Sequence, residues 1–386
     1  MSGFPGSFWW GTAASATQTE GAAPASDWRA WELAGRAPES GDGNGFATRY
    51  REDFALLADW GLTHHRLSLD WARLEPVRGQ YDRAAVEHYR EVLAAGRSAG
   101  LRIWVCLLHS VLPRWFAEAG GFLAPDAGQV WARHVDFVAD TFGDLVFGWK
   151  PVNAPASFAA RRYLTDQFPP GHVSRQEFAA ALRAVHLATV HAALRLRGGG
   201  QPVASVHALA PISPADPSPG AADAARALDG VVWGSWLALA RSDAFAEAFD
   251  HYGFSYYYAM AVDAAGGLHP HPSGLPVGPQ GYVRWAEGLG LVLRRLGEEL
   301  PGRSFLVSEL GWGGTDDLAR TKYLRAALAE VRGALGRGLD LRGVFFWTGI
   351  DNYEWLHGHR VPYGLFDLGR QPRGSAHAIR EIITRT

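Results

Sequence analysis

We predict an α/β fold made of a single (β/α)8 barrel, or TIM barrel, in which residues 1–386 form one domain. Short apolar runs alternate with longer helical patterns, and eight such units follow one another along the chain. A strand followed by a helix, repeated, gives parallel strands joined by crossovers, and eight units close into a barrel. The alternative is an open doubly wound sheet, which a glycine-rich phosphate loop would favour. No such loop follows any of the runs.

Each predicted strand is a short apolar run with turn residues around it. In chain order, the strands are expected at residues 8–11, 63–69, 102–108, 146–152, 203–207, 253–257, 305–308 and 343–347. Polar or aromatic residues stand at or just past the ends of most runs, namely Arg66, His109, Asn153, Tyr257, Glu309 and Trp347. In a barrel these ends meet on one face, where enzymes of this fold place their chemistry.

Helices are expected between the strands, because the intervening segments carry capping residues. Ser174 and Glu177 form a capping box ahead of one helix, and Asp82 caps another. The Pro/Gly-rich stretches 210–220 and 266–281 are predicted to be loops over the carboxyl face of the barrel, not linkers between domains.

The composition excludes several classes of protein. The 386 residues are 47% hydrophobic and 20% charged, with a net charge of −2, which predicts a globular protein without a nucleic-acid or membrane partner. The expected partner is a neutral small molecule. The single cysteine, Cys106, lies in an apolar run and is expected to be a buried thiol. Neither a signal peptide nor a run of 18 apolar residues is present, which predicts a cytoplasmic protein.

Three segments carry candidate chemistry. Glu309 follows an apolar strand, where a carboxylate is either used in function or paired with an arginine, and both readings stay open. Asn153 ends another strand, and Asn before Ala-Pro also suits a simple turn. Residues 345–355 place carboxylates between aromatic rings directly after a strand. This combination suits a site that grips sugar hydroxyls while rings stack on the carbon faces, and the 16 Trp and 12 Tyr of the chain agree with it.

Four segments resemble the sequence fingerprints of glycoside hydrolase family 1. They are residues 8–14 (FWWGTAA) with 18–21 (QTEG), 65–76 (HRLSLDWARLEP), 347–355 (WTGIDNYEW) and 363–367 (YGLFD). The similarity runs in order from residue 8 to about residue 375. It implies a hydrolase of carbohydrate metabolism, a retaining β-glycosidase that acts on β-glucosides or β-galactosides by double displacement.

The resemblance also implies roles for individual residues. Glu309 matches the nucleophile that forms a covalent glycosyl-enzyme intermediate. Arg66 and Tyr257 match the pair that holds this carboxylate ionised and oriented. Trp347 matches the ring on which the non-reducing sugar stacks. The residues that match those binding the sugar hydroxyls are Gln18, His109, Asn153, Glu354 and Trp355.

The chain departs from the family pattern at the acid/base position. The family motif W-x-T-x-N-E-P reads WKPVNAP over residues 149–155, so that Ala154 replaces the glutamate. Retaining hydrolysis uses two carboxyl groups, and general acid–base catalysis contributes roughly 10²–10⁴-fold in rate. Asp166 and Asp70 are candidate substitutes by proximity in sequence, although a solvated or structural role is more common for such residues.

Other family positions differ as well. The family's H-W-D-L-P reads HSVLP from residue 109, its N-Y-Y reads SYY from residue 255, and Leu310 replaces the asparagine after the nucleophile. Several changes together favour natural divergence over an engineered acid/base variant. Histidines at alternate positions in loops, His269 with His271 and His357 with His359, do not by themselves indicate a metal. We therefore expect no metal and no cofactor.

Two functions are compatible with this pattern. The first is an enzyme whose hydrolysis is impaired, restricted to activated leaving groups or diverted to transglycosylation, because Ala154 can neither donate nor accept a proton. The second is a non-catalytic sugar-binding or regulatory protein that keeps the sugar pocket. The retention of Glu309 with its expected partners Arg66 and Tyr257 favours the enzyme, since a binding site has no use for an oriented nucleophile. The natural aglycone, the choice between glucose and galactose, and the oligomeric state are left open.

Overall fold

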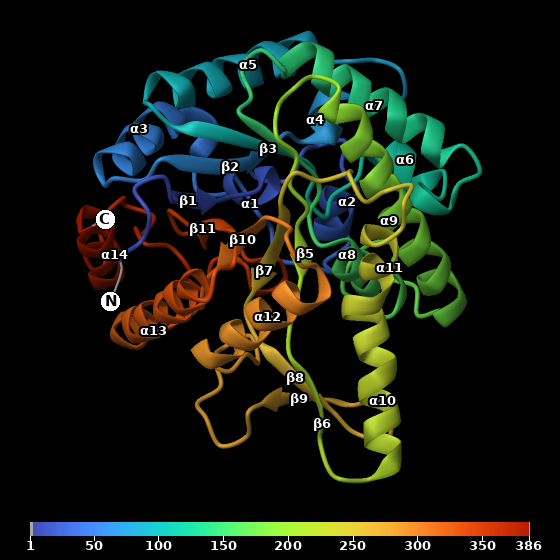
Figure 1. Ribbon diagram of the computed structural model, residues 1–386. Helices are drawn as coiled ribbons and strands as arrows, with labels where there is room; N and C mark the ends of the chain where they lie inside the picture. Colours follow the sequence, from blue (N-terminus) through green and yellow to red (C-terminus); the bar gives the residue numbers. More distant parts are fainter. Residues whose placement is uncertain (1–2, 386) are drawn as a thin grey trace.

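The computed structural model describes residues 3–385 and contains a closed barrel of parallel strands (Figure 1). Their order around the barrel is β4-β3-β2-β1-β11-β10-β7-β5. The bounds are β1 Trp9–Ala13, β2 His64–Ser68, β3 Arg102–Leu108, β4 Gly148–Val152, β5 His207–Ala208, β7 Tyr252–Tyr256, β10 Phe305–Leu310 and β11 Leu341–Trp347. Parallel bridges between Trp149 and Val203 and between Ala204 and His251 join the fifth unit to its neighbours. The predicted (β/α)8 barrel is confirmed, and the open sheet is excluded because the two edges pair.

All eight predicted strands overlap observed ones, with shifted ends. The fifth is regular only at His207–Ala208, and before it the chain makes the isolated bridges of Val203 and Ala204. The seventh predicted strand, 305–308, was too short, because β10 continues through Leu310 and Glu309 lies inside it. The pairing of β10 with β7 shifts register between Val307 and Glu309. Such an irregularity re-aims a side chain next to a site.

Helices surround the barrel, as the ribbon shows (Figure 1). Between the first strands lie α1 Ala16–Glu20, α2 Asp27–Leu33, α3 Phe46–Asp59, α4 Trp71–Leu74, α5 Arg83–Ser98, α6 Arg114–Glu118 and α7 Ala127–Phe142. The second half contains α8 Pro155–Tyr163, α9 Arg175–Arg197, α10 Pro219–Asp229, α11 Ser235–Ala240, α12 Ala286–Glu299, α13 Asp317–Gly336 and α14 Gly374–Thr384. Short 3₁₀ turns cover Gly121–Leu123 and Trp355–His357, and a π-helical turn covers Gly230–Gly234.

The predicted caps are present. The Ser174 hydroxyl accepts a hydrogen bond from the Glu177 backbone N–H at 3.2 Å, and the Asp82 carboxylate accepts from Ala84 and Ala85. These bonds satisfy backbone donors that the first turn of a helix leaves free. No helix among residues 3–385 is both long and apolar enough to cross a membrane.

The prediction of loops over 210–220 and 266–281 was partly wrong. A second sheet has the order β6-β8-β9, with β6 Ile212–Pro214, β8 Ala259–Val262 and β9 Leu268–His271. The first stretch also contains the start of α10. In Figure 1 this sheet and α10 project from the barrel at the bottom of the view. The Pro/Gly composition gave no sign of these strands. The hydrogen bonds of β6 come from β8, a partner almost fifty residues away in sequence, so the local sequence does not predict the pairing.

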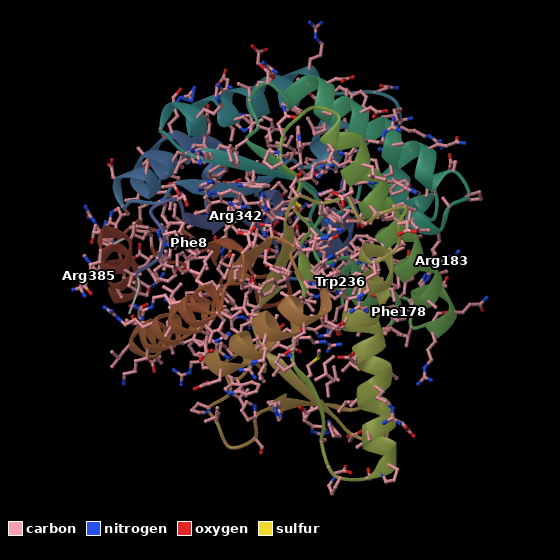
Figure 2. All side chains as sticks on the ribbon, viewed as in Figure 1. Phe8, Phe178, Arg183, Trp236, Arg342 and Arg385 are labelled. Carbon is pink, nitrogen blue, oxygen red and sulfur yellow. The ribbon has the colours of Figure 1, made fainter. Side chains whose placement is uncertain are left out.

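The core has an inner and an outer layer. Inside the barrel, Trp104, Leu306 and Phe345 pack together, whereas a larger apolar layer fills the space between strands and helices. Figure 2 shows Phe8 and Trp236 within the molecule and the charged Arg183 and Arg385 at its edge. The Cys106 thiol is buried, as predicted.

Candidate active site

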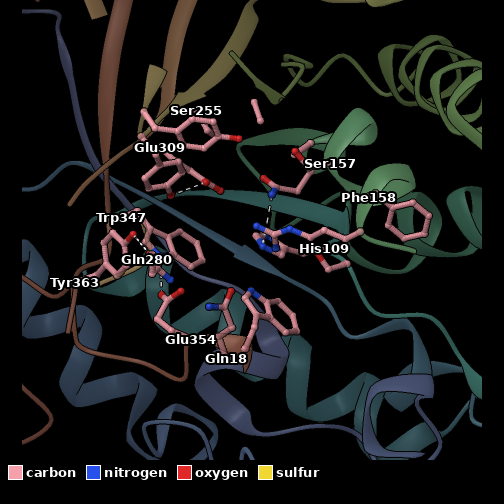
Figure 3. Close-up of a pocket in the computed structure, with 18 of the residues that line it drawn as sticks. Gln18, His109, Ser157, Phe158, Ser255, Gln280, Glu309, Trp347, Glu354 and Tyr363 are labelled. Atoms are coloured by element: carbon pink, nitrogen blue, oxygen red, sulfur yellow. Dashed lines mark hydrogen bonds between the residues drawn. The ribbon is translucent and has the colours of Figure 1, made fainter. Parts of the chain in front are cut away.

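A recess opens at the carboxyl ends of the strands and gathers the residues predicted from the sequence (Figure 3). Including its open mouth it has a volume of about 740 Å³, within the range of roughly 300–1,000 Å³ for small-ligand sites. Eight of the nine predicted site residues line it: Gln18, His109, Asn153, Tyr257, Glu309, Trp347, Glu354 and Trp355. The ninth, Arg66, is fully buried and bonds to Glu309. The structure thus brings all nine together, from elements spread over the whole chain.

The Glu309 carboxylate is held from two sides. The Tyr257 hydroxyl donates to Oε2 at 2.7 Å, and the Arg66 guanidinium donates to Oε1. Burial raises the pKa of Tyr257 well above its usual value, so its hydroxyl keeps the proton that it donates. A cation and a donor at a buried carboxylate favour its ionised form. This is the state in which a carboxylate acts as a nucleophile.

Arg66 is itself fixed by other parts of the site. Its guanidinium donates to the Ala14 carbonyl and to His109 Nδ1, each at 2.9 Å. Burial and the charge of Arg66 hold the pKa of His109 well below its usual range, so the ring is neutral. Nδ1 faces the Arg66 guanidinium, and Nε2 lies 3.5 Å from the Asn153 amide nitrogen. The His109 ring is nearly parallel to those of Trp347 and Trp355, at centroid distances of 5.7 and 6.3 Å.

One end of the recess combines polar groups with indole rings. Trp347 Nε1 donates to Glu354 Oε1 at 2.9 Å. Burial raises the pKa of Glu354 to about 8, against the opposing effects of Trp347 and the positive Arg161. The Gln18 amide donates to the Tyr353 carbonyl at 2.7 Å and accepts from the Ser15 hydroxyl at 2.8 Å. These fixed donors and acceptors beside ring faces form a surface that suits a pyranose.

Ala154 lines the recess at the start of α8. Its backbone is left-handed, with φ 48° and ψ 64°, a conformation that costs a residue other than glycine roughly 1–2 kcal/mol. Its N–H donates to the Val206 carbonyl at 2.8 Å, which ties it to the barrel wall. The methyl group offers the recess no proton donor or acceptor.

Neither carboxylate suggested by sequence proximity reaches the recess. Asp166 is exposed and forms an ion pair with Arg36 at 3.1 Å. Asp70 is buried and caps α4 through the N–H groups of Ala72 and Arg73. Both have the structural or solvated role that is common for such residues. Among the residues that line the recess, the carboxylates are Glu309 and Glu354.

Further recess residues were missed from the sequence. They come from α8, from the loop after β9 and from the segments after β7 and β11, and include Ser157, Phe158, Arg161, Tyr258, Gln280, Tyr282 and Tyr363. Helical periodicity from Ala154 points to the α8 members, which lie three, four and seven positions along one helix face. Gln280, which accepts from the Tyr363 hydroxyl, lies in a segment without periodicity, so no sequence signal marks it.

Comparison with known proteins agrees with this geometry. The sequence model of Glycosyl hydrolase family 1 matches residues 1–236 and 275–386. The chain belongs to this family. The unmatched segment, 237–274, contains β7, the extra strands β8 and β9, and Tyr257. The family 1 assignment therefore rests on the rest of the barrel, and Tyr257 enters the site through its contact with Glu309.

Family 1 relatives match over nearly the whole chain. Coniferin β-glucosidase of Pinus contorta is 25% identical, with 98% of this chain and 92% of the relative covered. Galactolipid galactosyltransferase of Arabidopsis thaliana is 27% identical over 93% of this chain and 60% of the relative. The structure of a β-glycosidase from Pyrococcus horikoshii superimposes with a TM-score of 0.90 at 26% identity, covering 99% of this chain and 95% of that one.

Proposed function

We propose that this protein is a retaining β-glycosidase that forms a covalent glycosyl-enzyme intermediate at Glu309. The observation that carries the proposal is the carboxylate of Glu309, oriented by Arg66 and Tyr257 and open to the recess. A site that only binds a sugar gains nothing from a carboxylate held in its ionised form. The oriented carboxylate therefore also argues against a purely regulatory protein.

The first step requires no proton at Glu309. One carboxylate oxygen of Glu309 attacks the anomeric carbon, and the bond from that carbon to the leaving group breaks. A glutamate at position 154 would protonate the departing oxygen, whereas the methyl group of Ala154 does not. Loss of general acid–base catalysis reduces the rate roughly 10²–10⁴-fold, or about 3–5 kcal/mol in barrier. Hydrolysis is therefore restricted to glycosides whose leaving groups need little protonation.

β-D-glucosides or β-D-galactosides are the substrate class that we infer. Gln18, His109, Asn153 and Glu354 supply hydroxyl-binding groups, and Trp347 supplies a stacking face. The name of the Pinus relative supports glucosides, and that of the Arabidopsis relative supports galactosides. The latter name also supports transfer of the sugar to an acceptor other than water. Transglycosylation is therefore the second candidate, since an acceptor can occupy the space beside Ala154.

The test uses a 2-deoxy-2-fluoro-β-glycoside with a dinitrophenolate leaving group. We expect a stable adduct on the peptide that contains Glu309, detected by mass spectrometry, and its release by azide. The Glu309→Gln variant serves as the control and should form no adduct. Tight sugar binding without any adduct would support the non-catalytic alternative and overturn the proposal.

A further inference from the structure

One positive charge that lines the recess has no carboxylate partner in an ion pair. Arg161 lines the recess from α8, on the helix face that also carries Ala154 and Ser157. It forms no ion pair with any residue of the described part of the chain, and its guanidinium lies over the Phe168 ring at 5.2 Å. The next residue, Arg162, is buried and pairs with Asp27 at 2.8 Å. Arg162 has an ion-pair partner, whereas the hydrogen-bond partner of the Arg161 side chain is the Tyr282 hydroxyl, which also lines the recess.

Arg161 lies seven residues after Ala154 on one face of α8, and both residues line the recess. Seven residues along a helix span roughly 10.5 Å, and helical side chains lean toward the N-terminus, here toward Ala154. The contact with the Phe168 ring restrains the Arg161 side chain. Figure 3 shows Ser157 and Phe158, from the same helix face, across the recess from Gln280 and Tyr363.

The missing acid determines what such a charge can do. Without a proton donor at position 154, the electron pair of the broken bond stays on the leaving group, which departs as an anion. A fixed guanidinium stabilises negative charge that develops in a site shielded from water. A carboxylic acid has a pKa of roughly 4, so a carboxylate leaves without needing a proton.

We propose that Arg161 stabilises leaving groups that depart as carboxylates, and that the recess takes β-glycosyl esters of carboxylic acids. This inference rests on the proposed function of Glu309. An oxygen of Glu309 bonds to the anomeric carbon, and the bond to the ester oxygen breaks with its electron pair, which releases a carboxylate beside Arg161. Water then attacks the anomeric carbon and the bond to Glu309 breaks. The proton of that water passes to the departed carboxylate, so that a free sugar and a carboxylic acid are the products.

Two substrates test the role of Arg161, because one releases an anionic leaving group and the other releases a neutral one. A 1-O-benzoyl β-glycoside releases the benzoate anion, whereas a β-glycosyl pyridinium salt releases neutral pyridine and needs neither acid nor cation. We expect Arg161→Gln to lower kcat/KM for the benzoyl ester about 10- to 100-fold, in line with loss of one electrostatic contact. For the pyridinium salt, kcat/KM should stay within about threefold. Arg161→Lys should recover part of the ester activity.

The controls separate this inference from structural damage and from the proposed function. Arg183→Gln removes one exposed charge from α9 and should leave both substrates unaffected. Equal losses for both substrates in Arg161→Gln, or no loss for the ester, would overturn the role of Arg161. Labelling of Glu309 without turnover of the ester by the wild type would overturn only the ester class. Absence of labelling would overturn the proposed function itself.

Discussion

Under the proposed function, Ala154 stands where the family motif has its acid/base glutamate. Its left-handed backbone and its bond to Val206 hold position 154 at the wall of the recess. The backbone geometry needed to present a side chain is therefore in place, and under the proposed function only the carboxyl group is missing. Restoring that group should restore the missing proton transfer.

Ala154→Glu is expected to raise kcat/KM for β-glucosides with weakly acidic aglycones about 10²–10⁴-fold. Dinitrophenyl glucoside should gain much less, because its leaving group needs no proton. Steady-state kinetics with a series of aryl glucosides measures both effects as a change in slope against the acidity of the aglycone. Ala154→Gln matches the size without the acid, and an equal gain in that variant would refute the proton-transfer explanation.

Two strands that are not adjacent in the barrel, β4 and β10, meet through an unusual buried group. Lys150 of β4 is fully buried inside the barrel, where its amine donates to the Ser308 hydroxyl of β10 at 3.2 Å. The amine also lies 4.3 Å from the centre of the Phe345 ring. Burial and the nearby charge of Arg66 hold the pKa of Lys150 well below its usual range. Between this lowered pKa and 10.5 the unfolded chain binds a proton that the folded protein does not, so the free energy of unfolding rises with pH through this window.

Lys150→Met should therefore raise the free energy of unfolding at pH 7 by about 1–3 kcal/mol, because it removes a buried polar group with a single hydrogen bond. It should also flatten the rise in stability between pH 7 and 10. Urea denaturation across this range measures both. Lys322, the only other lysine, is exposed, and Lys322→Met should change stability by less than about 0.5 kcal/mol. A destabilised Lys150→Met variant would show that the amine contributes net stability.

For the molecule as a whole, buried histidines make the free energy of unfolding depend on pH. Burial lowers the pKa values of His64, His65 and His134 to about 3, and those of His186 and His251 to about 4. Between these values and 6.5 the unfolded chain binds protons that the folded protein excludes. Stability must therefore rise as pH increases to 6.5 and be lost as pH falls.

His134 gives the clearest test of this coupling, because both of its ring nitrogens lack a hydrogen-bond partner and the ring stacks on Trp71 at 4.3 Å. His134→Leu should reduce the slope of stability against pH, between about pH 4 and 6.5, by up to about 1.4 kcal/mol per pH unit. Urea unfolding at half-unit steps measures the slope. The exposed His377 provides the control variant, His377→Leu. Parallel slopes for wild type and His134→Leu would show that His134 is protonated in the folded protein.

Local patterns predicted most of the barrel but not its projecting sheet. The barrel strands are largely buried on both faces, and each therefore has a largely apolar sequence. Capping residues identify the starts of several helices. The strands β6 and β9 are short, partly exposed and rich in proline and histidine, so no apolar run identifies them. Their hydrogen bonds come from β8, whose position only the folded chain supplies.

Local sequence patterns were sufficient to place the barrel strands along the chain and to identify the family 1 motifs and the candidate residues at the strand ends, because each of these depends on neighbouring residues. They left open whether Glu309 is paired or used. Tertiary structure shows Glu309 both bonded to Arg66 and open to the recess. It also brought Gln280 and Arg161 into the site and left Asp70 and Asp166 outside it. Distances between residues far apart in the chain depend on how the barrel closes, and no local pattern encodes them.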